Sequence, residues 1–289
     1  MPTFRQLAAP ILCGLVLGVL LGIAPQKVEA QEQSYASAKQ AYRLGMRAHR
    51  SGNSERALPA LTYAAGEGVL GAQLKLAEMF ETGNGVDQNK ATAFQYYQQI
   101  ADAYAETSPR HPVVGHIAGV FIKLAEYHAR GIEALNLESD LAKAAGFYLH
   151  AASYFGDPRA QYQLAKLHLA GEGVEQNPKL AVNWLANASR KRHAPSQALL
   201  GDLLWRGSAK IRRQPVKGLA LLALARRNAR GSDVVWIGDI TRRAQAEADP
   251  DDLAKAQDLG RDWAKTQSGH FVAPTAMPTL DTADTALGR

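Results

Sequence analysis

The stretch AQLKLAEMFETGNGV at residues 72–86 returns, with substitutions, as AQYQLAKLHLAGEGV at residues 160–174. Shorter copies run over residues 120–131 and 196–207, so the theme occurs four times. Within each copy, apolar residues recur three and four positions apart, which predicts an amphipathic helix. The copies start 48, 40 and 36 residues apart. Self-similarity on this scale indicates a repeat protein, in which each unit is a small piece of supersecondary structure.

A second apolar segment follows each copy, at residues 92–97, 143–148, 180–185 and 217–222. Large apolar residues recur at one place in these segments, again with helical spacing, so each repeat is predicted to be a pair of helices. One helix pair cannot bury its apolar faces alone, whereas stacked pairs bury them against their neighbours. The sequence therefore predicts an all-α solenoid of helix pairs.

Small residues hold two fixed places in the first helix of each repeat. An alanine or glycine stands at the same position inside the helix, where it lets neighbouring helices approach closely. These residues are Ala77, Ala125, Ala165 and Gly201. A glycine then ends each first helix, because a left-handed backbone is cheap only for glycine. These glycines are Gly83, Gly131, Gly171 and Gly207.

These motifs resemble Sel1-like repeats, which are relatives of the tetratricopeptide repeat, over about residues 72–230. The resemblance implies a right-handed α-α superhelix (solenoid) of Sel1/TPR-like helix pairs. Copies one and three match the pattern well. Copy two has Glu133 and Ala134 where Gly-Val would stand, and copy four has Ala209 and Lys210.

The predicted organisation has five parts. Residues 1–30 read as a signal peptide, since Arg5 precedes an apolar run and a small-x-Ala site ends at Ala30. Cleavage near Ala30 would export the protein, and a retained N-terminal anchor is the alternative. We expect a divergent helix pair at 31–71, four repeats at 72–231, capping helices at 232–267 and a disordered tail at 268–289.

Composition argues against most enzyme chemistry. The one cysteine, Cys13, lies in the predicted signal peptide, so the mature chain would hold no disulfide, thiol nucleophile or cysteine metal site. No Ser-His-Asp order, pocket pair of carboxylates or phosphate-binding loop stands out. We therefore expect no catalytic residue, no cofactor and no metal, and a protein that is not an enzyme.

Charge is distributed unevenly along the chain. Residues 190–243 hold 13 Lys and Arg against three Asp, whereas residues 31–189 are nearly balanced and residues 244–289 are acidic. A basic patch often binds nucleic acid, but an exported protein rarely meets any, so we expect no nucleic-acid partner. An acidic protein surface or an anionic membrane surface is the expected partner. A solvated basic face on ordinary helices is the alternative.

Related helix-pair solenoids line their concave face with the first helix of each pair. Carried over position by position, this predicts a partner-binding groove that offers aromatic, aliphatic and charged anchors. The predicted groove residues are Tyr42, Met46, His49, Leu74, Glu78, Glu81, Ile122, Glu126, Tyr162, Lys166, Asp202 and Trp205. For Tyr162 and Trp205, packing between neighbouring repeats is the alternative interpretation.

His128 and His168 occupy the same repeat position, where the Sel1 pattern usually has an aromatic residue. The plain interpretation is a partly buried histidine that serves packing. The sharper hypothesis is pH sensing, because imidazole titrates between about pH 5 and pH 8 and its charge would loosen a helix seam.

The divergent first unit, the interrupted copies and the stretch LAEYHARGI at residues 124–132 resemble the ExoR family, the negative regulators of exopolysaccharide production in rhizobia. The resemblance implies a periplasmic protein that binds the periplasmic domain of a membrane sensor histidine kinase and holds that kinase inactive. It also implies removal by a periplasmic protease. Two alternatives stay open: a periplasmic scaffold or adaptor for envelope or cell-wall assembly, and an enzyme that acts on peptidoglycan.

Overall fold

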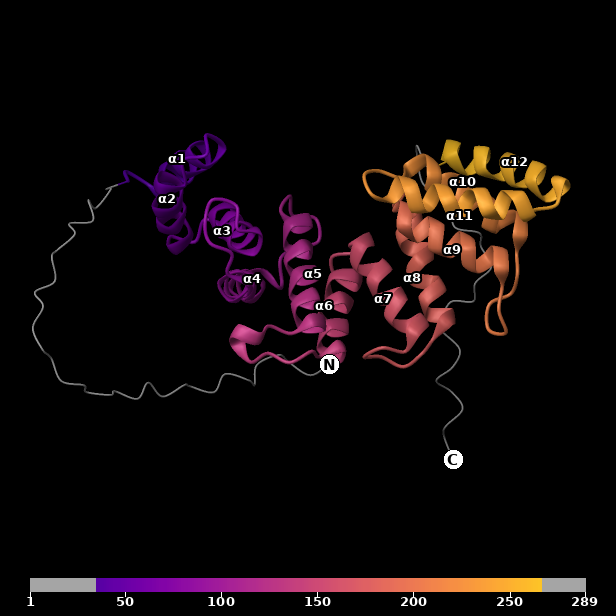
Figure 1. The fold of residues 1–289 in the computed structure, drawn as a ribbon, viewed down its shortest axis with the longest axis horizontal. Helices are drawn as coiled ribbons and strands as arrows, with labels where there is room; N and C mark the ends of the chain where they lie inside the picture. Colours follow the sequence, from indigo (N-terminus) through magenta and orange to yellow (C-terminus); the bar gives the residue numbers. More distant parts are fainter. Residues whose placement is uncertain (1–34, 267–289) are drawn as a thin grey trace, which may run out of the picture. The chain divides into compact units, whose positions relative to one another are not determined.

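The computed structural model describes residues 35–266, and within that range every regular element is helical (Figure 1). An isolated bridge between Ile132 and Leu137 is the one β-type pairing recorded there. The predicted all-α solenoid is thus confirmed. The predicted signal peptide and disordered tail lie outside the described residues, and the domain boundaries stay predictions. No helix in the described range is both long and apolar enough to cross a membrane.

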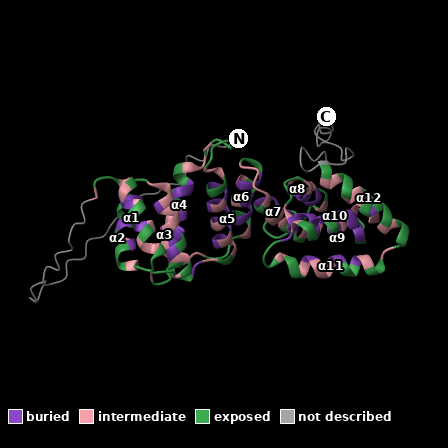
Figure 2. Ribbon diagram, turned by 90° about the horizontal axis from the view of Figure 1, so that it is seen from above, coloured by how far each residue is buried: buried purple, intermediate pink, exposed green. Residues whose placement is uncertain are grey.

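From α1 to α11, each helix packs against the next one in the chain. The first ten form five pairs: α1 (Ala38–Arg50) with α2 (Ser54–Gly66), α3 (Leu70–Thr82) with α4 (Lys90–Tyr104), α5 (Val114–Arg130) with α6 (Leu141–Ser153), α7 (Pro158–Ala170) with α8 (Pro178–Arg190), and α9 (Ala194–Arg206) with α10 (Pro215–Asn228). A short 3₁₀ helix (Glu133–Leu135) lies between α5 and α6. Buried residues lie between the helices, and exposed ones lie along their outer faces (Figure 2).

The last two helices close the stack differently. Both α11 (Asp233–Glu247) and α12 (Pro250–Thr266) pack against α10, and α11 also contacts α9. Their apolar residues, including Ala244 and Ala256, join Trp205 and Leu219 in one buried cluster. These helices therefore cover apolar surface that a further repeat would otherwise cover.

Side-chain caps begin four of the second helices. An Asn or Asp at the residue before the helix accepts a hydrogen bond from the backbone N–H three residues later, which satisfies a donor that the helix itself leaves unpaired. These caps are Asn53 on α2, Asn89 on α4, Asp140 on α6 and Asn177 on α8. Helix α10 lacks such a side-chain cap and instead has Pro215 in its first turn, where a missing N–H costs nothing.

The glycines that end the first helices divide into two kinds. Gly83 and Gly171 have left-handed backbone angles, with φ near 75° and ψ of 18° and 30°. Gly131 and Gly207 combine φ of 75° and 70° with ψ of 170° and 176°, a region that is essentially open to glycine alone. The second kind occurs in the two copies that lack Gly-Val, so the different loop sequence accompanies a different exit from the helix.

Helices α9 and α10 approach each other through two glycines. A Cβ added to Gly218 would lie 2.6 Å from the backbone nitrogen of Trp205 and 2.8 Å from the carbonyl oxygen of Gly201. A Cβ added to Gly201 would lie 2.9 Å from the carbonyl oxygen of Gly218. These contacts involve backbone, which cannot move aside as a flexible side chain can, so this seam needs glycine on both helices.

Replacing Gly218 by alanine is expected to destabilise the protein. The overpacking of a tight seam costs about 1–3 kcal/mol, which outweighs the gain of up to about 1 kcal/mol in helix propensity. Gly146 on α6 is the matched control, because a Cβ added there meets nothing within 4 Å. Urea unfolding should show lower stability for Gly218→Ala and equal or higher stability for Gly146→Ala. Equal stability of the two variants would contradict the tight seam.

Candidate functional site

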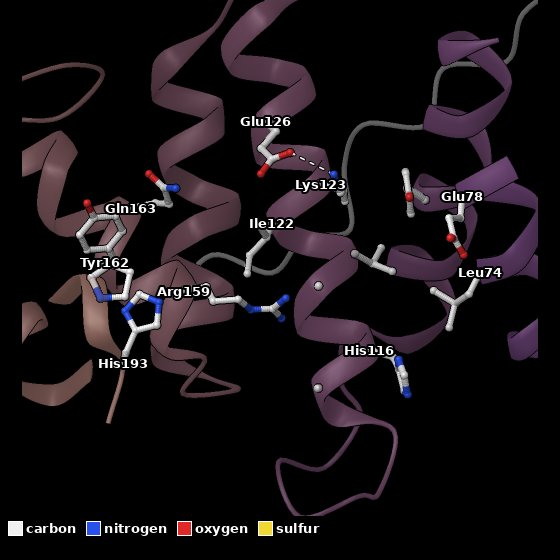
Figure 3. Close-up of a pocket in the computed structure, with 15 residues that line it drawn as sticks. Leu74, Glu78, His116, Ile122, Lys123, Glu126, Arg159, Tyr162, Gln163 and His193 are labelled. Carbon is white, nitrogen blue, oxygen red and sulfur yellow. Dashed lines mark hydrogen bonds and ion pairs between the residues drawn. The ribbon is translucent and has the colours of Figure 1, made fainter. Parts of the chain in front are cut away.

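A groove of about 740 Å³ runs across the first helices α3, α5 and α7 and reaches the start of α9 (Figure 3). One second helix also contributes, through Tyr97 of α4. The lining contains both apolar and charged side chains. Two glycines of α5, Gly115 and Gly119, also belong to it. The structure therefore places a mixed apolar and charged groove on the first-helix side of the repeats.

Five of the twelve predicted groove residues line this groove: Leu74, Glu78, Ile122, Glu126 and Tyr162. They come from the first helices α3, α5 and α7, for which the repeat register also predicted Glu81 and Lys166. The structure brings these five together from three repeats, even though the copies are separated by insertions.

The other seven lie outside the lining. Tyr42, Met46 and His49 are partly buried residues of α1. Lys166 places its ammonium 5.7 Å from the centre of the Tyr162 ring, and Asp202 is paired with Arg206 at 2.8 Å. Glu81 is outside the lining, but its carboxylate accepts hydrogen bonds from Lys123 and Tyr97, which belong to it.

Trp205 is the clearest departure from the predicted groove. Its side chain is 7% exposed and belongs to the buried cluster between α9, α10 and the closing helices. The guanidinium of Arg213 lies 5.1 Å from the ring centre and covers it. The packing alternative therefore describes Trp205, because the glycine seam draws α10 close enough to enclose the ring.

Two ion pairs and a hydrogen bond connect α3, α4 and α5 along one wall of the groove. The Lys123 ammonium lies 2.9 Å from Glu81 and 3.3 Å from Glu126, and the Tyr97 hydroxyl donates to Glu81 at 2.8 Å. Burial opposes the charge of Lys123, but its hydrogen bonds to the two carboxylates outweigh that effect and raise the pKa. Burial, reinforced by Glu81, raises the pKa of Tyr97 as well. This network fixes the wall and keeps Glu126 paired.

The opposite wall is built at the start of α7. Asp157 caps this helix, since its carboxylate accepts hydrogen bonds from the backbone N–H groups of Arg159 and Ala160. The same carboxylate binds the Arg159 side chain, from Nε at 3.2 Å and from Nη2 at 2.9 Å. Figure 3 shows the Arg159 side chain reaching from α7 toward α5.

His193 stands beside this wall, just before α9. Its ring centre lies 5.5 Å from that of Tyr162, and its Nδ1 lies 2.8 Å from the Ser196 hydroxyl oxygen. Burial lowers the pKa of His193, so the ring is mostly neutral near pH 7. Tyr162 and His193 together form an aromatic corner at this end of the groove (Figure 3).

Several lining residues were missed by the sequence reasoning, among them Tyr97, His116, Lys123, Arg159 and His193. Tyr97 belongs to a second helix, and His193 precedes a first helix. Arg159 follows the Asp-Pro pair that begins α7, and this capping sequence was a usable signal for its position. His116 lines the groove, yet residues 35–266 contain no group of three or more His, Cys, Asp or Glu side chains that could hold a metal ion.

His128 and His168, which occupy the same position in two repeats, differ in environment. His128 is 2% exposed and is stacked on Phe147 at 5.2 Å, with the edge of Phe94 at 5.6 Å. Burial and, to a lesser degree, Lys143 lower its pKa, whereas Asp140 opposes the shift. His168 is only partly buried, and its Nδ1 lies 3.1 Å from the carbonyl oxygen of Glu175. Of the pair, His128 is therefore the packing residue at a helix seam.

Comparison with known families and curated proteins identifies relatives over most of the chain. The Sel1 repeat family model matches residues 71–104, 158–193 and 194–228, which correspond to α3–α4, α7–α8 and α9–α10. An exopolysaccharide production negative regulator of Rhizobium leguminosarum bv. viciae is 33% identical over 223 residues, covering 77% of this chain and 81% of the relative. A protein of the same description from Rhizobium meliloti (strain 1021) is 34% identical over 211 residues, with 73% and 76% coverage.

A solved structure supports the fold independently. The crystal structure of a Sel1 repeat protein from Oxalobacter formigenes superposes with a TM-score of 0.57, at 21% identity, over 78% of this chain and 88% of that one. At this identity the likeness concerns the fold alone.

Replacing His128 by phenylalanine is expected to reduce the loss of stability in acid. The folded state lowers the pKa of His128, so the unfolded chain binds the proton more readily and stability falls as pH drops below about 6.5. Thermal melts from about pH 7 to about pH 5 should show a smaller decrease in Tm for His128→Phe than for the wild type. Some decrease should remain, because burial also lowers the pKa of His150 and His193.

His168→Phe serves as the control for that experiment, because the imidazole ring of His168 is only partly buried in the wild type. An acid-dependent decrease in Tm that is the same in His128→Phe as in the wild type would show that this seam does not sense pH.

Proposed function

From the premise that this chain belongs to the family of exopolysaccharide production negative regulators built on Sel1 repeats, we propose that it represses exopolysaccharide production by binding a membrane sensor histidine kinase. The first-helix groove would hold the periplasmic domain of that kinase in its inactive state. The protein would act from the periplasm, after export and cleavage near Ala30. A periplasmic protease that removes it would release the kinase.

The composition of the groove is the main support for placing the docking site there. It combines apolar residues, such as Leu74 and Ile122, with an aromatic corner and with charged groups on both walls. Aromatic and Arg side chains in a concave surface are the usual anchors of protein interfaces. The groove draws on three repeats and the start of a fourth, so a partner would contact several repeats at once, as solenoids commonly bind extended surfaces.

Non-covalent binding, and not catalysis, is the role we propose for the groove. Its two lining carboxylates each have a lysine partner: Glu78 pairs with Lys75 at 3.1 Å and Glu126 pairs with Lys123 at 3.3 Å. Catalytic pairs of carboxylates act on a shared substrate bond, whereas these two are engaged in ion pairs with neighbouring side chains. An envelope scaffold remains the alternative, and the identity of the captured partner separates it from the kinase regulator.

Replacing Gly115 by tryptophan is expected to block the groove without unfolding the protein. A Cβ added at Gly115 meets nothing within 4 Å, and the helix gains propensity on losing a glycine. The indole would fill space that a partner needs. We expect loss of kinase copurification and increased exopolysaccharide in cells that carry Gly115→Trp, with Tm unchanged or higher.

Gly146→Trp is the matched control for this variant. Gly146 is also an exposed helical glycine with open space at its Cβ, but it lies on the second helix α6. It should leave both kinase binding and exopolysaccharide at wild-type levels. If Gly115→Trp represses normally, or if the two variants behave alike, the groove is not the docking site. Copurification with envelope assembly proteins and no kinase would favour the scaffold.

A further inference from the structure

We propose that the groove contains a carboxylate-binding subsite at Arg159, which fixes the direction in which an extended segment of the partner lies. This inference rests on the proposed function for its biological partner, since it specifies the chemistry of what the same groove accepts. The partner segment would carry an acidic side chain, or a chain-end carboxylate, at the α7 wall. It would carry a Lys or Arg toward α3.

Arg159 is held in one orientation by Asp157. The Asp157 side chain is 9% exposed, and its carboxylate is itself fixed by two backbone N–H groups at the start of α7. It binds the edge of the guanidinium formed by Nε and Nη2. A guanidinium offers a second edge, formed by Nη1 and Nη2, that can bind another carboxylate through two parallel hydrogen bonds. This second edge is at the tip of the side chain that reaches across the groove (Figure 3).

Neighbouring groups leave that second edge accessible. The hydrogen bond to Asp157 does most to raise the pKa of Arg159, and the charge of Glu126 adds least. The Glu126 carboxylate is itself paired with Lys123. The Arg159 side chain is 54% exposed. Because the side chain is already oriented, a ligand carboxylate would bind it with a smaller loss of conformational entropy than it would a free surface arginine.

The surface of α5 lets a peptide backbone approach this point. Gly115 and Gly119 stand one helical turn apart on the groove side, and both belong to its lining. A Cβ added at Gly119 would lie 3.6 Å from Nη2 of Arg159, and one added at Gly115 would meet nothing within 4 Å. The Arg159 guanidinium thus lies over Gly119, whereas the open surface at Gly115 lets an extended segment lie directly against the helix beside it.

Charge on the opposite wall completes the polarity. Glu78, Glu81 and Glu126 face two lysines, Lys75 and Lys123, in the ion pairs recorded there. In these pairs two lysines serve three carboxylates, and the Glu78 side chain is 57% exposed. A cation on the partner would be attracted to this wall, while apolar side chains would fill the space over Leu74, Ile122 and Tyr162.

Selection from a phage-displayed library of random short peptides on the full-length purified protein tests the subsite. Selected peptides should be enriched in Asp or Glu at one position, and in Lys or Arg nearer the other end. Arg159→Gln should remove the preference for Asp or Glu and lower the affinity for the peptides selected on the wild type by about tenfold or more. Glu78→Gln should reduce the basic preference alone.

Two further variants separate a bidentate subsite from general charge attraction. Arg159→Lys keeps the charge but not the two parallel donors, so it should also lose the acidic preference. Arg190→Gln removes an exposed arginine on the second helix α8 and should select the same peptides as the wild type. Circular dichroism melts establish that each variant is folded.

Three results would overturn the subsite. The wild type could select peptides with no enrichment in Asp or Glu, or Arg159→Gln could still select acidic peptides. Arg159→Lys could also select the same peptides as the wild type. A failure of the proposed function is distinct from these. In that case acidic peptides would be selected and depend on Arg159, while no sensor kinase copurifies from cells. Conversely, kinase capture that is blocked by Gly115→Trp but unaffected by Arg159→Gln would reject the subsite and leave the docking groove standing.

Discussion

The close approach of neighbouring helices through very small residues is the constraint on which this structure depends. Ala77, Ala125 and Ala165 are fully buried at equivalent places in three first helices, and Gly201 takes that place in the fourth. With so little side chain between the axes, the larger apolar residues on either side meet and exclude water, which supplies most of the folding energy. The groove on the first-helix side is continuous with this core, since Ile122 belongs to both and Leu74 packs against the core while lining the groove.

The repeat periodicity was enough to predict most of the fold and part of the groove. Helical spacing and the terminal glycines predicted the helix pairs, because these are local signals that each repeat restates. The register of the repeat likewise predicted Leu74, Ile122 and Tyr162, since a residue's place on a helix face follows from its position in the repeat. The Asn and Asp caps of the second helices are a further local signal of where those helices begin.

The rest of the groove depended on distances between repeats, which a repeat register does not contain. Arg159 enters the groove because Asp157 turns its side chain there, and Tyr97 reaches it from a second helix. The repeat register predicts Trp205 as a groove anchor, yet the glycine seam between α9 and α10 encloses it. A pair of adjacent helices can thus change the exposure of a residue whose position in the repeat is unchanged.

Photo-cross-linking in cells, from single sites on the first-helix and second-helix sides, tests most directly whether the groove binds the kinase. A cross-linking amino acid would replace His116 on the first-helix side, or Gly146 on the second-helix side, in otherwise wild-type protein. If the first-helix groove is the docking site, position 116 captures the periplasmic domain of a membrane sensor histidine kinase and position 146 does not. Capture of the kinase from position 146 alone, or of no kinase from either site, would contradict it.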